Sequence, residues 1–272
     1  MKKIIVTILI IICASLLMLG LVGCVDNNNQ SSSGEINATE GLHDQSSSGE
    51  IGATEGLHYQ KIAGKQEYAL IGLGLAEEID IVIPSTYKGL PVTKIGNYAF
   101  MDCSGLTSVV IGDSVTSIGD LAFSGCTSLT SVVIPNSVTE IGSSAFRYCW
   151  GLKEVNYLGT IDQWAQIEFS GSSANPLYYT KQLKINGELV TEVNLTTATK
   201  ISNYAFFECS NLTSVVIPNS VTSIGGFAFS YCSGLKNIYY TGTQQQWNSI
   251  SKGDSWNYYT GSYTITYNYT GE

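Results

Sequence analysis

Cysteine and histidine are the side chains in this sequence that could act as nucleophiles, general bases or metal ligands. The chain has seven cysteines and two histidines. Five cysteines recur with a period of 23 residues, interrupted once: Cys103, Cys126, Cys149, Cys209 and Cys232. No histidine lies between residues 60 and 272, so a Cys-His or Ser-His catalytic pair is not available there. A spacing of 23 also fits no compact metal motif, and we interpret these cysteines as buried apolar residues, in preference to disulfides.

Two other groups of residues could carry chemistry. His43 and His58 occupy equivalent positions in a tandem duplication, in which residues 30–44 recur as 45–59. A metal site there is conceivable, but two histidines in a Ser-, Gly- and Glu-rich tether are better interpreted as bystanders. Asp162 and Glu168 could form the carboxylate pair of a glycosidase, but we expect them on different faces of a short helix. The sequence therefore favours a protein that is not an enzyme and needs no cofactor or metal.

The acidic charge balance argues against nucleic acid and anionic lipid as partners. The chain has 13 basic and 22 acidic residues, a net charge of −9. Loss of an N-terminal segment carrying Lys2 and Lys3 would make the mature chain more acidic still. An acidic chain with dispersed lysines is not suited to nucleic acid or to electrostatic docking on anionic lipid.

The cysteines belong to a repeat, Ile-Gly-x-x-Ala-Phe-x-x-Cys-x-x-Leu-x-x-Val-x-Ile-Pro. Its phenylalanine falls at 100, 123, 146, 206 and 229. The interval between Phe146 and Phe206 holds one repeat and an insertion of 37 residues. A fixed period in this range is typical of solenoids, in which each unit buries its apolar side only by stacking on its neighbours.

Each coil is expected to contain two halves. Residues 129–134 alternate and are rich in β-branched side chains, which predicts a short strand ended by Pro135. Residues 118–126 have the apolar spacing of about one turn of helix. Stacked coils should then form rows of like residues: Ile95, Ile118 and Ile141; Phe100, Phe123 and Phe146; Leu106, Leu129 and Leu152; Val109, Val132 and Val155; and in a second run Ile201 and Ile224, Phe206 and Phe229, Leu212 and Leu235, Val215 and Ile238.

This pattern resembles the BspA-like leucine-rich repeats of bacterial surface proteins. The residues that carry the resemblance are Ile-Gly-Ser-Ser-Ala-Phe-Arg-Tyr-Cys at 141–149 and Leu-Thr-Ser-Val-Val-Ile-Pro-Asn-Ser-Val at 129–138 and 212–221. The match covers most of 81–157 and 189–240. It implies a curved right-handed solenoid of leucine-rich repeats, display at the cell surface, and a role in binding or adhesion.

Two similar modules close the two runs of repeats. Residues 157–167 align with 240–250, and Thr160 and Thr243 stand where an N-cap would start a short helix carrying Trp164 or Trp247. Asn186-Gly187 predicts a hairpin within 183–190, and residues 68–75 and 79–84 predict two strands. The expected boundaries are an N-terminal β cap at 60–94, repeats at 95–157, an inserted helix-hairpin module at 158–188, repeats at 189–240 and an aromatic-rich cap at 241–272.

The N-terminus predicts export. Residues 1–23 form a lipoprotein signal peptide with Lys2, Lys3 and an apolar stretch, and Leu21-Val-Gly-Cys24 resembles a lipobox, in which Cys24 would take the lipid. An uncleaved membrane helix is the alternative. Residues 24–59, with the duplication, are expected to be a disordered linker. We thus predict a protein held on the outer face of a bacterial membrane by its lipid alone.

The outward residues of the strands form the leading candidate for a binding surface, with a host or microbial surface protein as the partner. They make one polar row and one largely apolar row: Ser108, Ser131, Glu154, Ser214 and Asn237; and Val110, Val133, Asn156, Val216 and Tyr239. Exposed apolar rows often mark interaction sites, and solenoids bind through extended faces. The other interpretation is that these valines serve strand propensity alone.

Two further functions stay open. The alternating Tyr263, Ile265, Tyr267 and Tyr269 share one face of a strand, with Trp256, Tyr258 and Tyr259 nearby, and could bind a polysaccharide. The competing interpretation is that this face packs on the last coil as a cap. A structural, self-associating surface protein is the third possibility, because the valine row could serve self-association as well.

Overall fold

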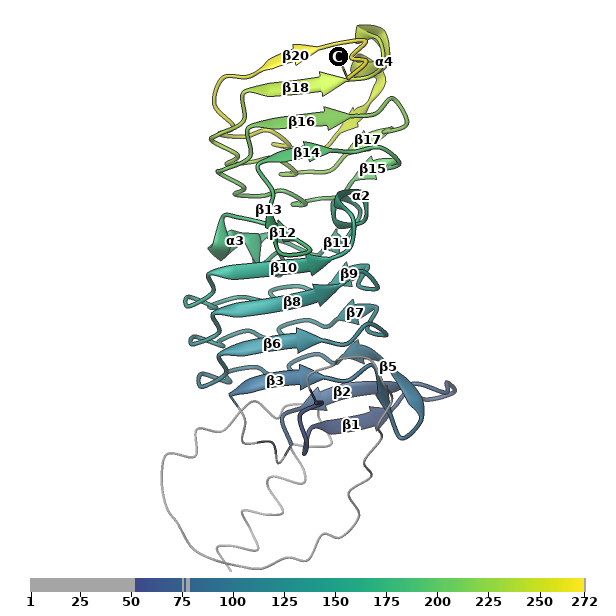
Figure 1. The fold of residues 1–272 in the computed structure, drawn as a ribbon, viewed down its shortest axis with the longest axis vertical. Coiled ribbons are helices and arrows are strands. Elements are labelled where there is room, and N and C mark those ends of the chain that lie inside the picture. Colours follow the sequence, from purple (N-terminus) through teal and green to yellow (C-terminus); the bar gives the residue numbers. More distant parts are fainter. Residues whose placement is uncertain (1–51, 75, 77–78, 272) are drawn as a thin grey trace, which may run out of the picture.

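The computed structural model describes residues 52–74, 76 and 79–271. It is an elongated solenoid with a long face of parallel strands, shown toward the viewer in Figure 1. This strand face has two sheets in line: β3 (Asp80–Ile83), β6 (Ser108–Ile111), β8 (Ser131–Pro135), β10 (Glu154–Leu158), β12 (Lys184–Ile185) and the antiparallel β13 (Glu188–Leu189); then β14 (Glu192–Asn194), β16 (Ser214–Ile217), β18 (Asn237–Tyr240) and β20 (Thr264–Thr266).

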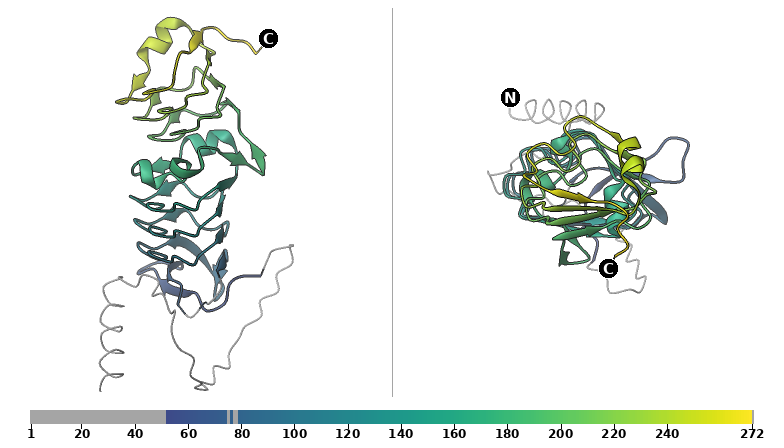
Figure 2. Two further views of the ribbon diagram at one scale, coloured as in Figure 1. Left: turned by 90° about the vertical axis from the view of Figure 1, so that its left-hand side faces the viewer. Right: turned by 90° about the horizontal axis from the view of Figure 1, so that it is seen from above.

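A second, narrower set of strands runs alongside this face, mostly at the right-hand edge of the molecule in Figure 1. It also has two parts: β1 (His58–Lys61), β2 (Tyr68–Gly72), β5 (Leu90–Ile95), β7 (Ser117–Ile118), β9 (Glu140–Ile141) and β11 (Glu168–Phe169), with β4 (Thr86–Tyr87) on β5; then β15 (Lys200–Ile201), β17 (Ser223–Ile224) and β19 (Ser251–Lys252). The helical elements are few: α2 (Ile161–Ala165), the 3-10 turn η1 (Ser172–Ala174), α3 (Leu177–Thr180) and α4 (Gln244–Ser249). The views along and down the solenoid show that the coils superpose (Figure 2).

The predicted rows of like residues are confirmed. Val109, Val132 and Val155 are register partners on adjacent parallel strands, and Val215 pairs with Ile238. The rings of Phe123 lie 5.2 Å from Phe100 and 5.3 Å from Phe146, nearly parallel to both. All these side chains are buried, so the spacing of 23 builds one continuous core along the axis.

The other half of the coil, predicted as a short helix or turn, forms a stack of turns. Each repeat holds two residues at positive φ, which no helix permits, and its N–H groups alternate between partners. Phe100 N donates to Ala122 O of the next coil at 2.7 Å, whereas Met101 N donates back to Tyr98 O at 3.0 Å. The positive-φ residues recur with the repeat: Tyr98, Leu121, Ser144, Tyr204 and Phe227; and Asp102, Gly125, Tyr148, Glu208 and Tyr231.

The end of the expected linker is folded, which corrects its boundary. Thr54 exchanges hydrogen bonds with Val82 at 3.0 and 2.9 Å, and Leu57 is buried. Tyr59, at the start of β1, stacks on Tyr87 with ring centroids 4.1 Å apart. The first copy of the duplication has Asp44 at the place of Tyr59. The aromatic ring of Tyr59 therefore adds a contact between the second copy and β4.

Four of the five repeat cysteines are free and buried, as predicted: Cys126, Cys149, Cys209 and Cys232. Cys103 is disulfide-bonded, so the free-thiol prediction is wrong for it. The thiol of Cys149 donates to Phe123 O at 3.1 Å, and burial raises its pKa to about 12. Such a thiol carries no thiolate at neutral pH and packs as an apolar side chain.

The predicted signal peptide and Cys24 lie outside the described residues, as does His43. Within the described ranges, no helix has the length and apolar character needed to cross a bilayer. In the same ranges no group of three or more His, Cys, Asp or Glu side chains is placed to hold a metal ion.

Candidate binding surfaces

The strand face brings the predicted binding residues into register. Val110 pairs with both Val82 and Val133, and Val216 pairs with Tyr239. The polar row runs beside the valines in the same way, with Ser131 between Ser108 and Glu154 and Ser214 opposite Asn237. Except for the exposed Glu154, these side chains are half-buried, so each offers one edge to solvent on a nearly flat surface.

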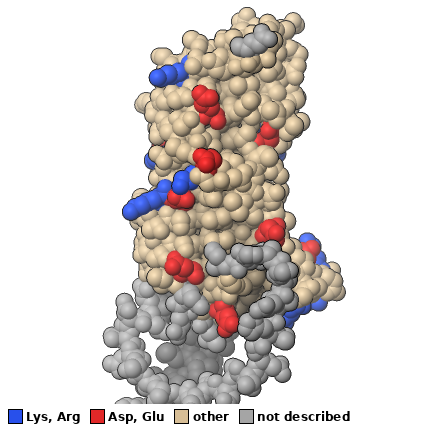
Figure 3. Space-filling model, in the orientation of Figure 1, with Lys and Arg blue, Asp and Glu red and all other residues tan. Residues whose placement is uncertain are grey.

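Few charges interrupt this face, as Figure 3 shows. Its strands contribute mainly Ser, Thr, Val and Asn to the outward positions. Asp80 is one exception, and its carboxylate accepts hydrogen bonds from Thr107 and Ser108 at 2.5 and 2.6 Å. These hydroxyls lower the pKa of Asp80, so it stays ionised near neutral pH.

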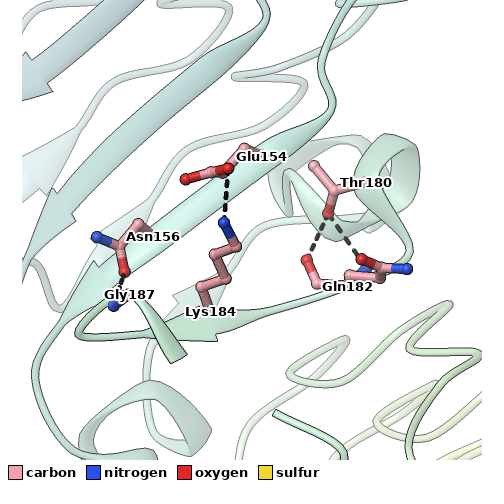
Figure 4. Close-up of polar contacts among 6 residues, drawn as sticks. All are labelled: Glu154, Asn156, Thr180, Gln182, Lys184 and Gly187. Carbon is pink, nitrogen blue, oxygen red and sulfur yellow. Dashed lines mark hydrogen bonds and ion pairs between the residues drawn. The ribbon is translucent and has the colours of Figure 1, made fainter. Parts of the chain in front are cut away.

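The inserted hairpin covers two of the predicted residues. Glu154 forms an ion pair with Lys184 at 2.7 Å, and Asn156 Oδ1 accepts a hydrogen bond from Gly187 N at 2.8 Å. Figure 4 shows both contacts, made by the hairpin β12–β13 where it continues the sheet beyond β10. Glu154 and Asn156 therefore act first as intramolecular partners, and the sheet breaks after this hairpin before it resumes at β14.

The C-terminal aromatics chiefly close the solenoid. Trp256, Tyr263 and Tyr267 pack against the core, and Trp256 contacts Trp247 at 6.0 Å. Tyr269 stacks on Tyr239 at 4.5 Å. The alternation predicted for this strand is present: Tyr263, Ile265 and Tyr267 pack onto the core, whereas Tyr269 lies against the outward Tyr239. Of the five residues predicted for sugar binding, Tyr259 alone is strongly exposed, at 64%.

A second surface, of which sequence reasoning identified only Tyr258 and Tyr259, runs along the turns that precede the strands. Its rings touch one another in an unbroken series, with centroids 4.3–6.1 Å apart. We call it the aromatic stripe: Tyr148, Trp150, Tyr178, Tyr179, Phe207, Tyr231, Tyr258 and Tyr259. It follows the side of the molecule on which α3 lies, which faces the viewer in Figure 2, left. One feature of the sequence could have indicated this surface. The repeat position that holds Gly125 in one copy holds a tyrosine in two others, Tyr148 and Tyr231.

The two carboxylates that could have formed a catalytic pair have separate structural roles. Asp162 is buried, and its Oδ1 accepts hydrogen bonds from the backbone N–H groups of residues 196, 197 and 198 at 2.9, 2.8 and 2.7 Å. Burial by itself would raise its pKa, but these donors stabilise the carboxylate and the pKa is lowered. Glu168 is exposed and forms an ion pair with Lys200.

Comparison with known proteins agrees with the repeat. A family model described as a BspA-type leucine-rich repeat region matches six copies over residues 80–189 and 199–253. No curated protein matches the chain.

Several solved structures resemble this one. A leucine-rich repeat protein of T. pallidum is 23% identical, over 77% of this chain and 83% of that one, with a TM-score of 0.41. A leucine-rich cell surface protein of Faecalibacterium prausnitzii is 29% identical, over 73% of this chain and 41% of that one, with a TM-score of 0.36. A leucine-rich repeat protein of Bacteroides ovatus is 20% identical, over 78% and 70%, with a TM-score of 0.40.

Proposed function

Because this chain belongs to the family of BspA-type leucine-rich repeat proteins, we propose that it is a cell-surface binding protein that recognises a protein partner. The binding surface is the strand face, and the partner is a host or microbial surface protein. The solenoid serves as a scaffold and catalyses no reaction. The predicted lipobox at Cys24 supports display on the outer face of a bacterial membrane.

The observation that carries this proposal is the alignment of Val82, Val110 and Val133 on three neighbouring strands. A row of half-buried apolar side chains beside a row of hydroxyls presents apolar contact area with hydrogen-bonding groups at its border. This combination, with few charges, is typical of the surfaces that proteins use to bind one another. Val216 continues the same pattern in the second run, beside Tyr239, whose ring is stacked on Tyr269.

The test is a substitution that places a charge in the centre of the row. Val133→Asp should weaken binding of the purified chain, beginning at Val25, to an immobilised panel of extracellular-matrix and bacterial surface proteins by about tenfold or more. Ser117→Asp is the matched control, since it adds the same charge on β7, in the second set of strands. Equal binding by Val133→Asp and the wild type, with both melting normally, would contradict the proposal.

Display is tested separately. Cys24→Ser should abolish labelling of the protein by a radioactive fatty acid in the native host and release it from the membrane fraction. Labelling that survives this change would exclude Cys24 as the attachment site.

A further inference from the structure

Two tyrosines of the aromatic stripe, Tyr148 and Tyr231, stand at a repeat position where the fold favours other residues. The second residue after the repeat phenylalanine always has a positive φ: 57° at Asp102, 79° at Gly125, 63° at Tyr148, 65° at Glu208 and 62° at Tyr231. Glycine and aspartate adopt this conformation readily, whereas a bulky side chain is disfavoured there. The turn itself therefore does not select tyrosine. Strained residues of this kind are a reason to suspect function.

Most rings of the stripe are also exposed or half-buried, and Phe207 is its one buried member. Trp150 is 67% exposed, and Tyr148 is 43% exposed. Of the eight strongly exposed large apolar side chains in the described ranges, five belong to the stripe and three do not: Ile79, Leu158 and Leu189. The stripe is thus the largest concentration of exposed aromatic surface in the part of the chain that the structure describes.

The shape and charge of the stripe indicate its ligand. Its exposed rings lie at its two ends, and half-buried Tyr178 and Tyr179 with buried Phe207 connect them by ring contacts. This narrow, elongated arrangement suits a linear polymer. Lys181 is paired with Glu208 at 2.5 Å, and Arg147 lies over the ring of Tyr148 at 4.4 Å. Because Lys181 is neutralised by its pairing with Glu208, the stripe carries little net charge, and this favours a neutral ligand over a charged one. The apolar C–H faces of sugar rings stack on aromatic rings, and the tyrosine hydroxyls can bind sugar hydroxyls.

We propose that the aromatic stripe binds a linear neutral polysaccharide, whose successive sugar rings stack along it. This surface is separate from the strand face, and the proposal holds whether or not the strand face binds a protein. It shares Tyr258 and Tyr259 with the sugar site expected at the C-terminal strand but excludes Trp256, Tyr263 and Tyr267, which are occupied in packing.

The test is electrophoresis of the chain beginning at Val25 through native gels containing hydroxyethylcellulose, galactomannan or amylopectin. At least one of these neutral polymers should retard the wild type. Trp150→Ala and Tyr148→Gly should each weaken the retardation about fivefold, and the double variant about tenfold or more. Leu158→Ala is the matched control, since Leu158 is 43% exposed and lies outside the stripe; it and Val133→Asp should be retarded like the wild type.

The following results would overturn the proposal. The first is no retardation of the wild type by any of the three polymers. The second is equal retardation of the double variant and the wild type. Retardation by polygalacturonate alone would show a charged ligand. Binding to gelatin that the same variants abolish would make the stripe a protein-binding surface. Thermal unfolding distinguishes lost binding from lost folding, because Tyr148→Gly relieves a positive-φ residue and should melt no lower than Leu158→Ala.

Discussion

The chain contains the same closing module twice, once between the runs of repeats and once after the second run. In both copies a threonine forms a capping box with a glutamine three residues later, at Thr160 in α2 and Thr243 in α4. In both, the helix tryptophan packs edge-on against the tyrosine of the preceding strand, with centroids 5.4 Å apart for Trp164 and 5.3 Å for Trp247. The internal copy nevertheless joins two runs, while the other covers the last coil.

The difference is concentrated in a few side chains. Asp162 holds the backbone of residues 196–198, and Trp164 Nε1 donates to Ala205 O at 2.8 Å. The equivalent of Asp162 in the other copy is the exposed Gln245. The internal module can join two runs because Asp162 accepts hydrogen bonds from backbone N–H groups at the start of the next run. Such groups are costly to bury without a partner. We call the internal module the joint and the C-terminal module the cap.

The comparison of the two modules requires that the repeats beneath each of them contribute similarly to stability. Phe123→Ala and Phe229→Ala should each lower the free energy of unfolding by about 3–5 kcal/mol, because each truncates a buried ring. Phe229 is flanked by Phe206 at 5.2 Å and Trp256 at 6.3 Å, much as Phe123 is flanked by two phenylalanines. Urea denaturation followed by circular dichroism measures both. An unchanged midpoint for either variant would show that its row is not part of the core.

The sharpest contrast is between Asp162 and Gln245. Asp162→Ala should cost about 3 kcal/mol, since it leaves three backbone N–H groups without their acceptor. Gln245→Ala, on the exposed face of α4, should change stability by less than about 0.5 kcal/mol. Urea denaturation of the two variants side by side tests this. Equal losses would mean that the joint does not depend on Asp162.

Much of this architecture is readable in the sequence. The rows of the core, both capping boxes and the Asn186-Gly187 hairpin follow from local spacing, because each depends on residues within one repeat or one turn. The helix in the repeat could not be excluded in that way. Its apolar spacing is helical, and what prevents it is a positive φ at residues such as Leu121 and Ser144, which no pattern of side chains announces.

The parts of the sites that escaped prediction depend on contacts between distant segments. The donors to Asp162 lie more than 30 residues further along the chain. The stripe combines Trp150 from a repeat with Tyr179 from the insertion, so the period of the repeat relates only some of its members. The strand rows were predictable, but the hydrogen bond that engages Asn156 comes from the insertion at Gly187.

The Asp162 joint should also respond to pH. Its pKa is lower in the folded chain than its ordinary value, since three N–H donors outweigh the effect of burial. The stabilisation is therefore complete above about pH 4, the ordinary range of aspartate, and is lost as pH falls through the lowered pKa. Urea midpoints of wild type and Asp162→Asn should converge as the pH is lowered from neutral. A constant difference would show that this carboxylate does not titrate with folding.

The two tryptophans offer a smaller contrast. Trp164→Phe removes the hydrogen bond to Ala205 O and should cost about 1–2 kcal/mol. In Trp247→Phe the loss should be about half of that or less, because the hydrogen bonds of the structure include none from the Trp247 indole in the described ranges. Thermal melts of the two variants measure the difference. A larger loss of stability in Trp247→Phe than in Trp164→Phe would contradict the assignment of the internal module as the joint.

The central claim is that the strand face, rather than the turn side, binds a protein partner. Its most direct test is one binding titration, on the partner captured by the wild type, with Val133→Asp and Trp150→Ala compared at equal folded concentration. The account predicts that Val133→Asp weakens protein binding by about tenfold or more and that Trp150→Ala leaves it unchanged. Wild-type affinity for Val133→Asp, together with loss of binding in Trp150→Ala, would contradict it.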